Sequence, residues 1–144
     1  MSAEPYARFS IMGKDIFLAK RSVSGTVIAV MDLRLPDREL KLITPHTRAV
    51  KSGEIHELIL TSNPDAKPGS SVKGAVYLCF FEVTKGGIVA VGDILFLRKE
   101  PLCSIAGFDE THMPNHMNII CYTKEPKTGG EIGLHLGEEL IISS

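Results

Sequence analysis

The stretch VKGAVYLCFFEV, residues 72–83, is apolar at both its even-numbered and its odd-numbered positions. Successive side chains of a β-strand point to opposite faces, so a strand of this composition is covered on both sides. In a domain of 144 residues, the second cover is either a loop packed on the wall of a closed barrel or a neighbouring subunit. We therefore expect self-association into a homo-oligomer, which would bury this strand and hide sheet edges.

Turn residues recur at short intervals along the rest of the chain and separate runs rich in aliphatic and β-branched residues. Lys85-Gly86-Gly87 predicts a hairpin, because glycine adopts the positive φ angles that tight turns require. Gly92 and Asp93 interrupt the next apolar run, where a strand bends or bulges and Asp93 caps a turn. We expect strands at 8–20, 26–34, 38–43, 55–61, 72–84, 87–98, 101–108, 116–123 and 131–142.

Only the segment TPHTRAVKSG, residues 44–53, has the signals of a helix. Thr44 suits the N-cap, Pro45 the first helical position, and Gly53 the position after the end. The sequence thus predicts a mainly β protein. It would be a single-domain antiparallel β-barrel or bent β-sandwich over residues 1–144, with one short helix.

Composition narrows the class of protein. The chain is 44% hydrophobic and 23% charged, as globular proteins are, and its net charge of −1 disfavours nucleic-acid binding. We find neither a signal peptide nor an apolar run long enough for a bilayer, so no membrane partner is expected. Cys79, Cys103 and Cys121 are odd in number and lack a C-x-x-C pair, which favours core thiols in a reducing, cytoplasmic setting.

The stretch GFDETHMPNHMN, residues 107–118, holds the densest group of reactive side chains: Asp109, Glu110, His112, Asn115 and His116. We expect an irregular loop, because the proline in its middle cannot take the positive φ of a primed hairpin turn. Irregular loops on a rigid scaffold often carry function, and this loop is our candidate site.

Two chemistries fit this loop. His112 and His116 would lie about 13 Å apart on an extended strand, so they share one ion only if the chain turns between them. With such a turn, His112, His116 and Asp109 could ligate a divalent transition metal, with Glu110 as general base. This describes a small metal-assisted lyase, isomerase or hydrolase.

The other chemistry, which we prefer, is a binding or accessory module for a small anionic or polar ligand. Asp109, Asn115 and His116 would line its pocket. His46 would join them from the first turn of the predicted helix, where backbone N–H groups attract anions and where it could also complete a three-histidine metal site.

Other stretches are less specific. KPGSSVKG, residues 67–74, has the glycine, hydroxyls and lysines of a phosphate loop but lacks the P-loop spacing, so we interpret it as a strand-entry loop. His56 and His135 are expected to be exposed strand residues. Neither a G-x-S-x-G elbow nor a G-x-G-x-x-G motif is present, which disfavours α/β-hydrolase and dinucleotide-binding folds.

Overall fold

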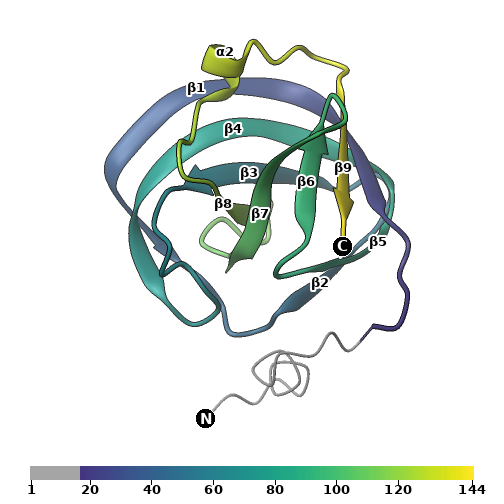
Figure 1. The fold of residues 1–144 in the computed structure, drawn as a ribbon, viewed down its shortest axis with the longest axis horizontal. Helices are drawn as coiled ribbons and strands as arrows, with labels where there is room; N and C mark the ends of the chain where they lie inside the picture. The colour runs from purple at the N-terminus through teal and green to yellow at the C-terminus, as the bar shows by residue number, and fades with distance from the viewer. Residues whose placement is uncertain (1–16) are drawn as a thin grey trace.

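A computed structural model describes residues 17–144 and shows a mainly β architecture, as the sequence predicts (Figure 1). Seven strands close into an uneven ring in the order β1-β4-β3-β8-β7-β6-β9, and β2 pairs with β5 in a separate two-stranded sheet. The elements are β1 (Val23–Lys41), β2 (Thr47–Val50), β3 (Ile55–Thr61), β4 (Ser71–Lys85), β5 (Gly87–Ala90), β6 (Ile94–Leu97), β7 (Glu100–Asp109), β8 (Asn118–Tyr122), α2 (Gly129–Ile132) and β9 (Glu139–Ser143).

The ring is mixed rather than wholly antiparallel. Strands β3 and β8 run parallel, from the pair Glu57 and Asn118 to the pair Thr61 and Tyr122. The other ladders of the ring are antiparallel. The parallel pair matters for the site, because it sets Glu57 directly beside Asn118.

Strands β1 and β4 form a long bent ribbon around one side of the ring (Figure 1). The strands expected at 26–34 and 38–43 are one strand, β1, which continues through Pro36. The register shifts between Val30 and Leu33 and again between Leu35 and Glu39. Such bulges leave residues unpaired and bend the strand, which lets proline be accommodated and the ring close.

Buried residues form two hydrophobic clusters on opposite faces of the central strands. In β3, Leu58 and Leu60 belong to the larger cluster and Ile59 to the smaller one. Gly107 in β7 lets the Leu42 side chain pack against the smaller cluster, since a Cβ there would lie 2.6 Å from it. The chain itself therefore covers both faces of residues 75–79, without a partner subunit; self-association stays a prediction that has lost this support.

The helix predicted at 44–53 is wrong. Thr47–Val50 is strand β2, because pairing with β5 outweighs the weak local helix signals. The helix is instead α2, which begins after Thr128 with a capping box: the Thr128 hydroxyl accepts from the Glu131 N–H, and the Glu131 carboxylate accepts from the Thr128 N–H. It includes the first two residues of the strand expected at 131–142, and only the last four residues of that range, 139–142, lie in β9.

The strand expected at 8–20 lies mostly outside the described residues, and residues 17–20 are irregular. Two contacts fix the segment that follows. The Lys20 ammonium lies 2.6 Å from the Asp93 carboxylate, both buried, and Arg21 Nε donates to the Gly86 carbonyl at 2.7 Å. Asp93 also accepts from the Ala90 N–H at 2.9 Å, which confirms its predicted role in the turn.

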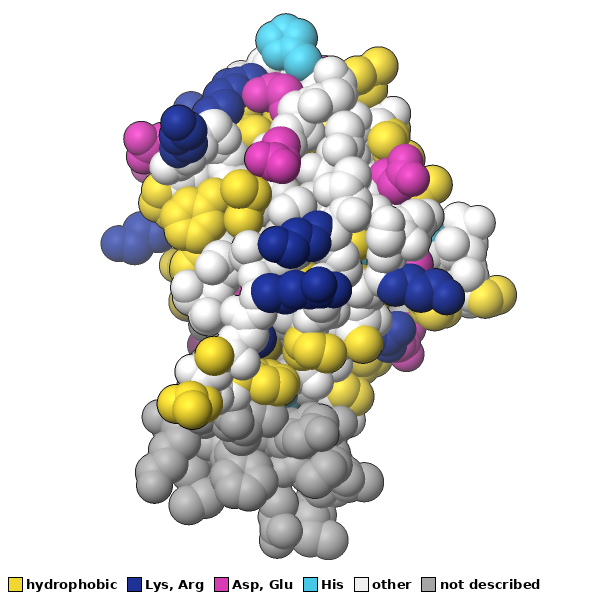
Figure 2. Space-filling model, turned by 90° about the vertical axis from the view of Figure 1, so that its right-hand side faces the viewer, with side chains coloured by type: hydrophobic (Ala, Val, Ile, Leu, Met, Phe, Trp, Pro, Cys, Tyr) yellow, Lys and Arg dark blue, Asp and Glu magenta, His cyan; other side chains and the backbone are white. Residues whose placement is uncertain are grey.

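Cys79, Cys103 and Cys121 are free and buried, as predicted for core thiols, and burial raises the pKa of Cys79 to about 12. Within residues 17–144, the structure has no helix that is both long enough and apolar enough to cross a bilayer. The face seen in Figure 2 intersperses acidic and basic side chains and carries no extended field of one sign.

Candidate functional site

Buried polar side chains form one row across the ring. Glu57 on β3 pairs in register with Asn118 on β8, and Asn118 pairs with Asp109 on β7. Phe80 on β4 continues the row on the other side of Glu57. Glu57 is 4% exposed, and Asn118 and Asp109 are fully buried. The row lies on the face of the smaller hydrophobic cluster, because Glu57 has the same parity along β3 as Ile59.

Two further side chains reach this row from outside it. Arg38 on β1 donates from Nη1 to the Tyr77 hydroxyl at 3.0 Å. His116, in the loop between β7 and β8, places Nε2 at 3.3 Å from Glu57 Oε1, without hydrogen-bond geometry. We call the set of six residues the polar cluster: Arg38, Glu57, Tyr77, Asp109, His116 and Asn118.

Packing on both sides fixes the His116 ring. Phe80 meets it edge-on, with ring centroids 4.9 Å apart, and His112 stacks on it at 5.2 Å. Burial lowers the pKa of His116, with Asn118 opposing the shift, so the neutral ring is favoured. Asn115 Nδ2 lies 2.8 Å from Nδ1 of His116. If Asn115 donates there, the ring proton is on Nε2, beside Glu57.

Three atoms of the polar cluster lack hydrogen-bond partners although they are buried: Arg38 Nη2, His116 Nε2 and Asn118 Oδ1. Within residues 17–144 no other buried side-chain nitrogen or oxygen is in this state. Buried polar groups in folded proteins are nearly always bonded, and an unsatisfied one costs roughly 1–3 kcal/mol. The Asn118 side chain does interact with His116, whose pKa it raises against the effect of burial, but without the geometry of a hydrogen bond. A group that completes the three atoms would therefore meet two donors and one acceptor.

The two carboxyl groups of the row behave differently. Burial raises the pKa of Glu57 to about 7, against the opposing charges of His112 and Arg38. Burial would also raise the pKa of Asp109, but hydrogen bonding by Thr111 and by the Lys41 backbone, together with the Arg38 charge, lowers it below its ordinary value. Glu57 thus titrates near neutral pH, whereas Asp109 stays ionised.

Asp109 is bound to its surroundings through both oxygens. Oδ2 accepts from the Lys41 N–H at 2.9 Å, and Oδ1 accepts from the Thr111 N–H at 2.8 Å. Oδ1 also accepts from Asn118 Nδ2 at 3.4 Å. This bond orients the Asn118 amide and leaves its Oδ1 as the acceptor of the polar cluster.

Only some of the site residues predicted from the sequence lie in the polar cluster. Asp109 and His116 belong to the polar cluster, and Asn115 is exposed beside His116. Glu110, our candidate general base, forms an ion pair with Arg48 instead. His46 lies in the bend before β2, so the helix terminus on which its anion-binding role depended is absent.

The metal hypothesis needs a turn between His112 and His116, and the chain does turn there. The His112 carbonyl accepts from the Asn115 N–H at 2.8 Å, and the two imidazole rings stack. Among the described residues, however, no group of three His, Cys, Asp or Glu side chains could hold a metal ion. The three-ligand convergence that this hypothesis requires does not occur in that part of the chain.

Glu57, Arg38 and Tyr77 were not predicted from the sequence, and Asn118, which ends the stretch 107–118, was not named as a site residue. Glu57 could have been suspected, because a carboxylate interrupts the apolar run of β3 at the parity of Ile59. The positions of Arg38 and Tyr77 depend on the bent ribbon of β1 and β4, which no local sequence pattern specifies. The prediction for His56 was wrong: it is buried, and its Nδ1 accepts from the Met117 N–H at 3.2 Å.

Fold and site together define a mixed β-barrel protein with a partly unsatisfied polar cluster buried against its smaller core. The chain belongs to a family of unknown function, DUF6917, whose model matches residues 17–143. No curated protein and no solved structure matches it.

Proposed function

We propose that the polar cluster binds a small polar or anionic molecule. The observation that carries this proposal is that the buried atoms Arg38 Nη2, His116 Nε2 and Asn118 Oδ1, all of the polar cluster, lack hydrogen-bond partners. Unsatisfied polar groups destabilise a fold, and a ligand that bonds to them recovers that free energy on binding.

The donors and the acceptor define the chemistry of the ligand. Arg38 and His116 would donate to a ligand oxygen, and the Arg38 charge favours a carboxylate or another oxyanion there. Asn118 would accept from a hydroxyl or amine of the same molecule. Glu57 faces this place with a pKa of about 7, so its protonated form accommodates an anion without repulsion. A small hydroxy acid or amino acid has the required combination of groups.

The metal-assisted alternative has weaker support. Its remaining candidate ligands are the stacked imidazoles of His112 and His116. Asp109 is hydrogen-bonded to backbone N–H groups, and Glu110 is ion-paired with Arg48. Ligand binding through Arg38 requires no further group from the chain.

The test is a ligand-observed NMR screen of small hydroxy acids, amino acids and sugar phosphates against the wild type, Arg38→Gln and Lys124→Gln. Lys124 is the control, since it is an exposed cation that does not belong to the polar cluster. We expect at least one compound to bind saturably and Arg38→Gln to weaken it about tenfold or more, as for a lost charge-assisted hydrogen bond. Lys124→Gln should bind it as the wild type does.

Two outcomes would contradict the proposal. One is that no compound of these classes binds to the wild type. The other is that the compounds that bind lose affinity equally in Arg38→Gln and Lys124→Gln, which would show that only the overall positive charge matters. Circular dichroism of each variant verifies that the fold is retained.

A further inference from the structure

We propose that the protein has a second ligand site, an oxyanion-binding cavity between the β1–β4 ribbon and the segment that follows β8. The cavity has a volume of about 220 Å³. Arg34 on β1 and Lys73 on β4 contribute two cations to its lining, and Thr61 and Ser62 contribute two hydroxyls. No aspartate or glutamate lines it. This composition favours a negatively charged ligand.

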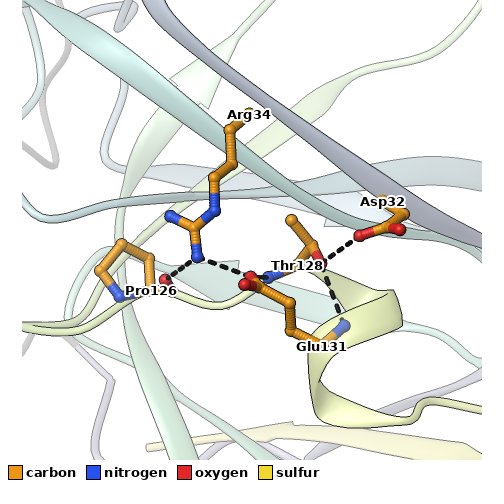
Figure 3. Close-up of polar contacts among 5 residues, drawn as sticks. All are labelled: Asp32, Arg34, Pro126, Thr128 and Glu131. Carbon is orange, nitrogen blue, oxygen red and sulfur yellow. Dashed lines mark hydrogen bonds and ion pairs between the residues drawn. The ribbon is translucent and has the colours of Figure 1, made fainter.

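The Arg34 guanidinium is held in place at the edge of the cavity. Its Nη2 donates to the Pro126 carbonyl at 3.2 Å and lies 2.5 Å from the Glu131 carboxylate (Figure 3). The Thr128 hydroxyl, also drawn there, donates to Asp32 at 2.7 Å and anchors the first turn of α2. These bonds use only Nη2. Within residues 17–144, no group accepts a hydrogen bond from Nε or Nη1 of Arg34, so these two groups can donate to a ligand.

Lys73 is the second cation, and its charge is not neutralised by an ion pair with any residue in the range 17–144. Its cross-strand partner in register is Glu39, but that carboxylate lies 3.9 Å from the Lys41 ammonium instead. Arg34 shares its charge with Glu131, which lines a neighbouring cavity. The net charge on the lining of the proposed site therefore stays positive.

The hydroxyl groups suit the same ligand. Thr61 is 1% exposed, and its Oγ1 accepts from the Asn63 N–H at 3.2 Å. Its O–H is thus left to donate to an oxyanion, as is that of Ser62. Thr61 lies on β3 on the same face as Glu57, four positions further along the strand. The cavity is therefore distinct from the polar cluster, toward the other end of the smaller core.

The size and the remaining walls narrow the ligand class. Pro36, Val76 and Pro126 give the cavity apolar surface beside its cations. A molecule with one carboxylate or phosphate group and a short carbon skeleton fits such a site. The strand-entry interpretation of residues 67–74 describes its first part, where the Lys67 carbonyl accepts from the Ser70 hydroxyl at 2.7 Å. Its last two residues, Lys73 and Gly74, line the cavity.

The experiment is a titration with three probes, inorganic phosphate, acetate and glycerol 3-phosphate, followed by amide ¹H–¹⁵N NMR at constant ionic strength. We expect saturable shifts confined to the amides of Ser62, Gly74 and Ala75. Lys73→Gln should weaken the binding about tenfold, as should Arg34→Gln. The matched control is Lys124→Gln, an exposed lysine that lines neither this cavity nor the neighbouring one, and it should bind as the wild type does.

The three probes separate the two forms of the anionic group. Preference for phosphate and glycerol 3-phosphate identifies a phosphate ester as the ligand class, and preference for acetate identifies a carboxylate. Shifts that do not saturate, that spread over surface lysines, or that weaken equally in Lys73→Gln and Lys124→Gln would overturn the proposal. Arg38→Gln should retain this binding, so the failure of either site is distinguishable from the failure of the other.

Discussion

Glu57 and Asp109 show how local hydrogen bonding decides the charge of a buried carboxyl. Both lie in the same row of the sheet, separated by Asn118 on β8. Asp109 accepts from two backbone N–H groups and from the Asn118 amide, and its pKa is lowered. Among the described residues no group donates a hydrogen bond to Glu57, and burial raises its pKa. The Asp109 carboxylate thus stabilises structure, whereas the Glu57 carboxyl titrates near neutral pH.

The Glu57 pKa makes a prediction about stability. Because the folded-state value of about 7 exceeds the ordinary 4.5, the folded protein binds this proton more tightly than the unfolded chain does. Glu57 therefore lowers the free energy of unfolding progressively as pH rises from about 4.5 to about 7. The Gln side chain in Glu57→Gln is neutral at every pH, so the free energy of unfolding of this variant should not fall in this way. Its unfolding free energy relative to the wild type should rise over that interval by on the order of 2 kcal/mol.

Urea denaturation from pH 4 to pH 8 measures this difference. The control is Glu125→Gln, which removes an exposed carboxylate and should show no such change. A difference between Glu57→Gln and the wild type that is the same at every pH would contradict the raised pKa.

At the scale of elements, the turn between β6 and β7 contains two residues in an unusual conformation. Arg98 and Lys99 have φ angles of 54° and 66°, which L-residues other than Asn and Asp rarely adopt. Arg98 donates from Nε and Nη2 to the two carboxylate oxygens of Glu138, both at 2.8 Å. These bonds offset the backbone cost at Arg98, but no comparable contact of Lys99 exists within the described chain.

Lys99→Gly should therefore stabilise the protein, by about 0.5 kcal/mol, because glycine takes a positive φ at little cost but has more freedom in the unfolded chain. Arg98→Gly relieves the same backbone strain but loses the Glu138 pair, so it should gain less or should destabilise. Thermal and urea unfolding of the two variants compare them directly. A loss of stability in Lys99→Gly would contradict this prediction, because it would show that the Lys99 side chain makes a stabilising contact.

Helix α2 depends on two glycines for different reasons. A Cβ on Gly129 would lie 2.2 Å from the Leu78 carbonyl oxygen, and backbone there cannot give way. Gly133 has a φ of +74° as the C-cap, with open space around it. Gly129→Ala should cost about 3 kcal/mol or more, and Gly133→Ala only about 1 kcal/mol. Equal losses of unfolding free energy would mean that α2 does not pack closely on β4.

The helix also shows what sequence patterns could and could not predict. Thr128 and Glu131 have the spacing of a capping box, so the start of α2 was open to prediction although we expected a strand there. The helix signals at Thr44 and Pro45 were equally strong, but the residues that follow them form strand β2, which pairs with β5, and no helix. Local signals of this kind fail where a long-range strand pairing competes with them.

At the scale of the whole molecule, the composition of residues 72–83 correctly indicated burial on both faces. It could not indicate which part of the chain supplies the second cover. That cover depends on the bent ribbon, which carries Leu40 back over the central strands. The parallel pairing of β3 with β8 is likewise non-local, so the sequence placed Asp109 and His116 in one loop but could not bring Glu57 to them.

Two adjacent phenylalanines test this arrangement. Phe81 is 1% exposed within the larger cluster, whereas Phe80 is half-buried and meets the edge of His116. Phe81→Ala should lower the unfolding free energy by about 3–5 kcal/mol, and Phe80→Ala by clearly less. Phe80→Ala should instead shift the ring resonances of His116. The opposite order of stability losses would contradict the assignment of the two faces of β4.

The most direct measurement is a crystal structure of the protein with the compound that binds most tightly in the NMR screen. We predict that this compound lies within hydrogen-bond distance of Arg38 Nη2, His116 Nε2 and Asn118 Oδ1, the three atoms that lack partners. A compound bound away from the polar cluster, with those three atoms bonded to other groups of the protein, would contradict the proposed function.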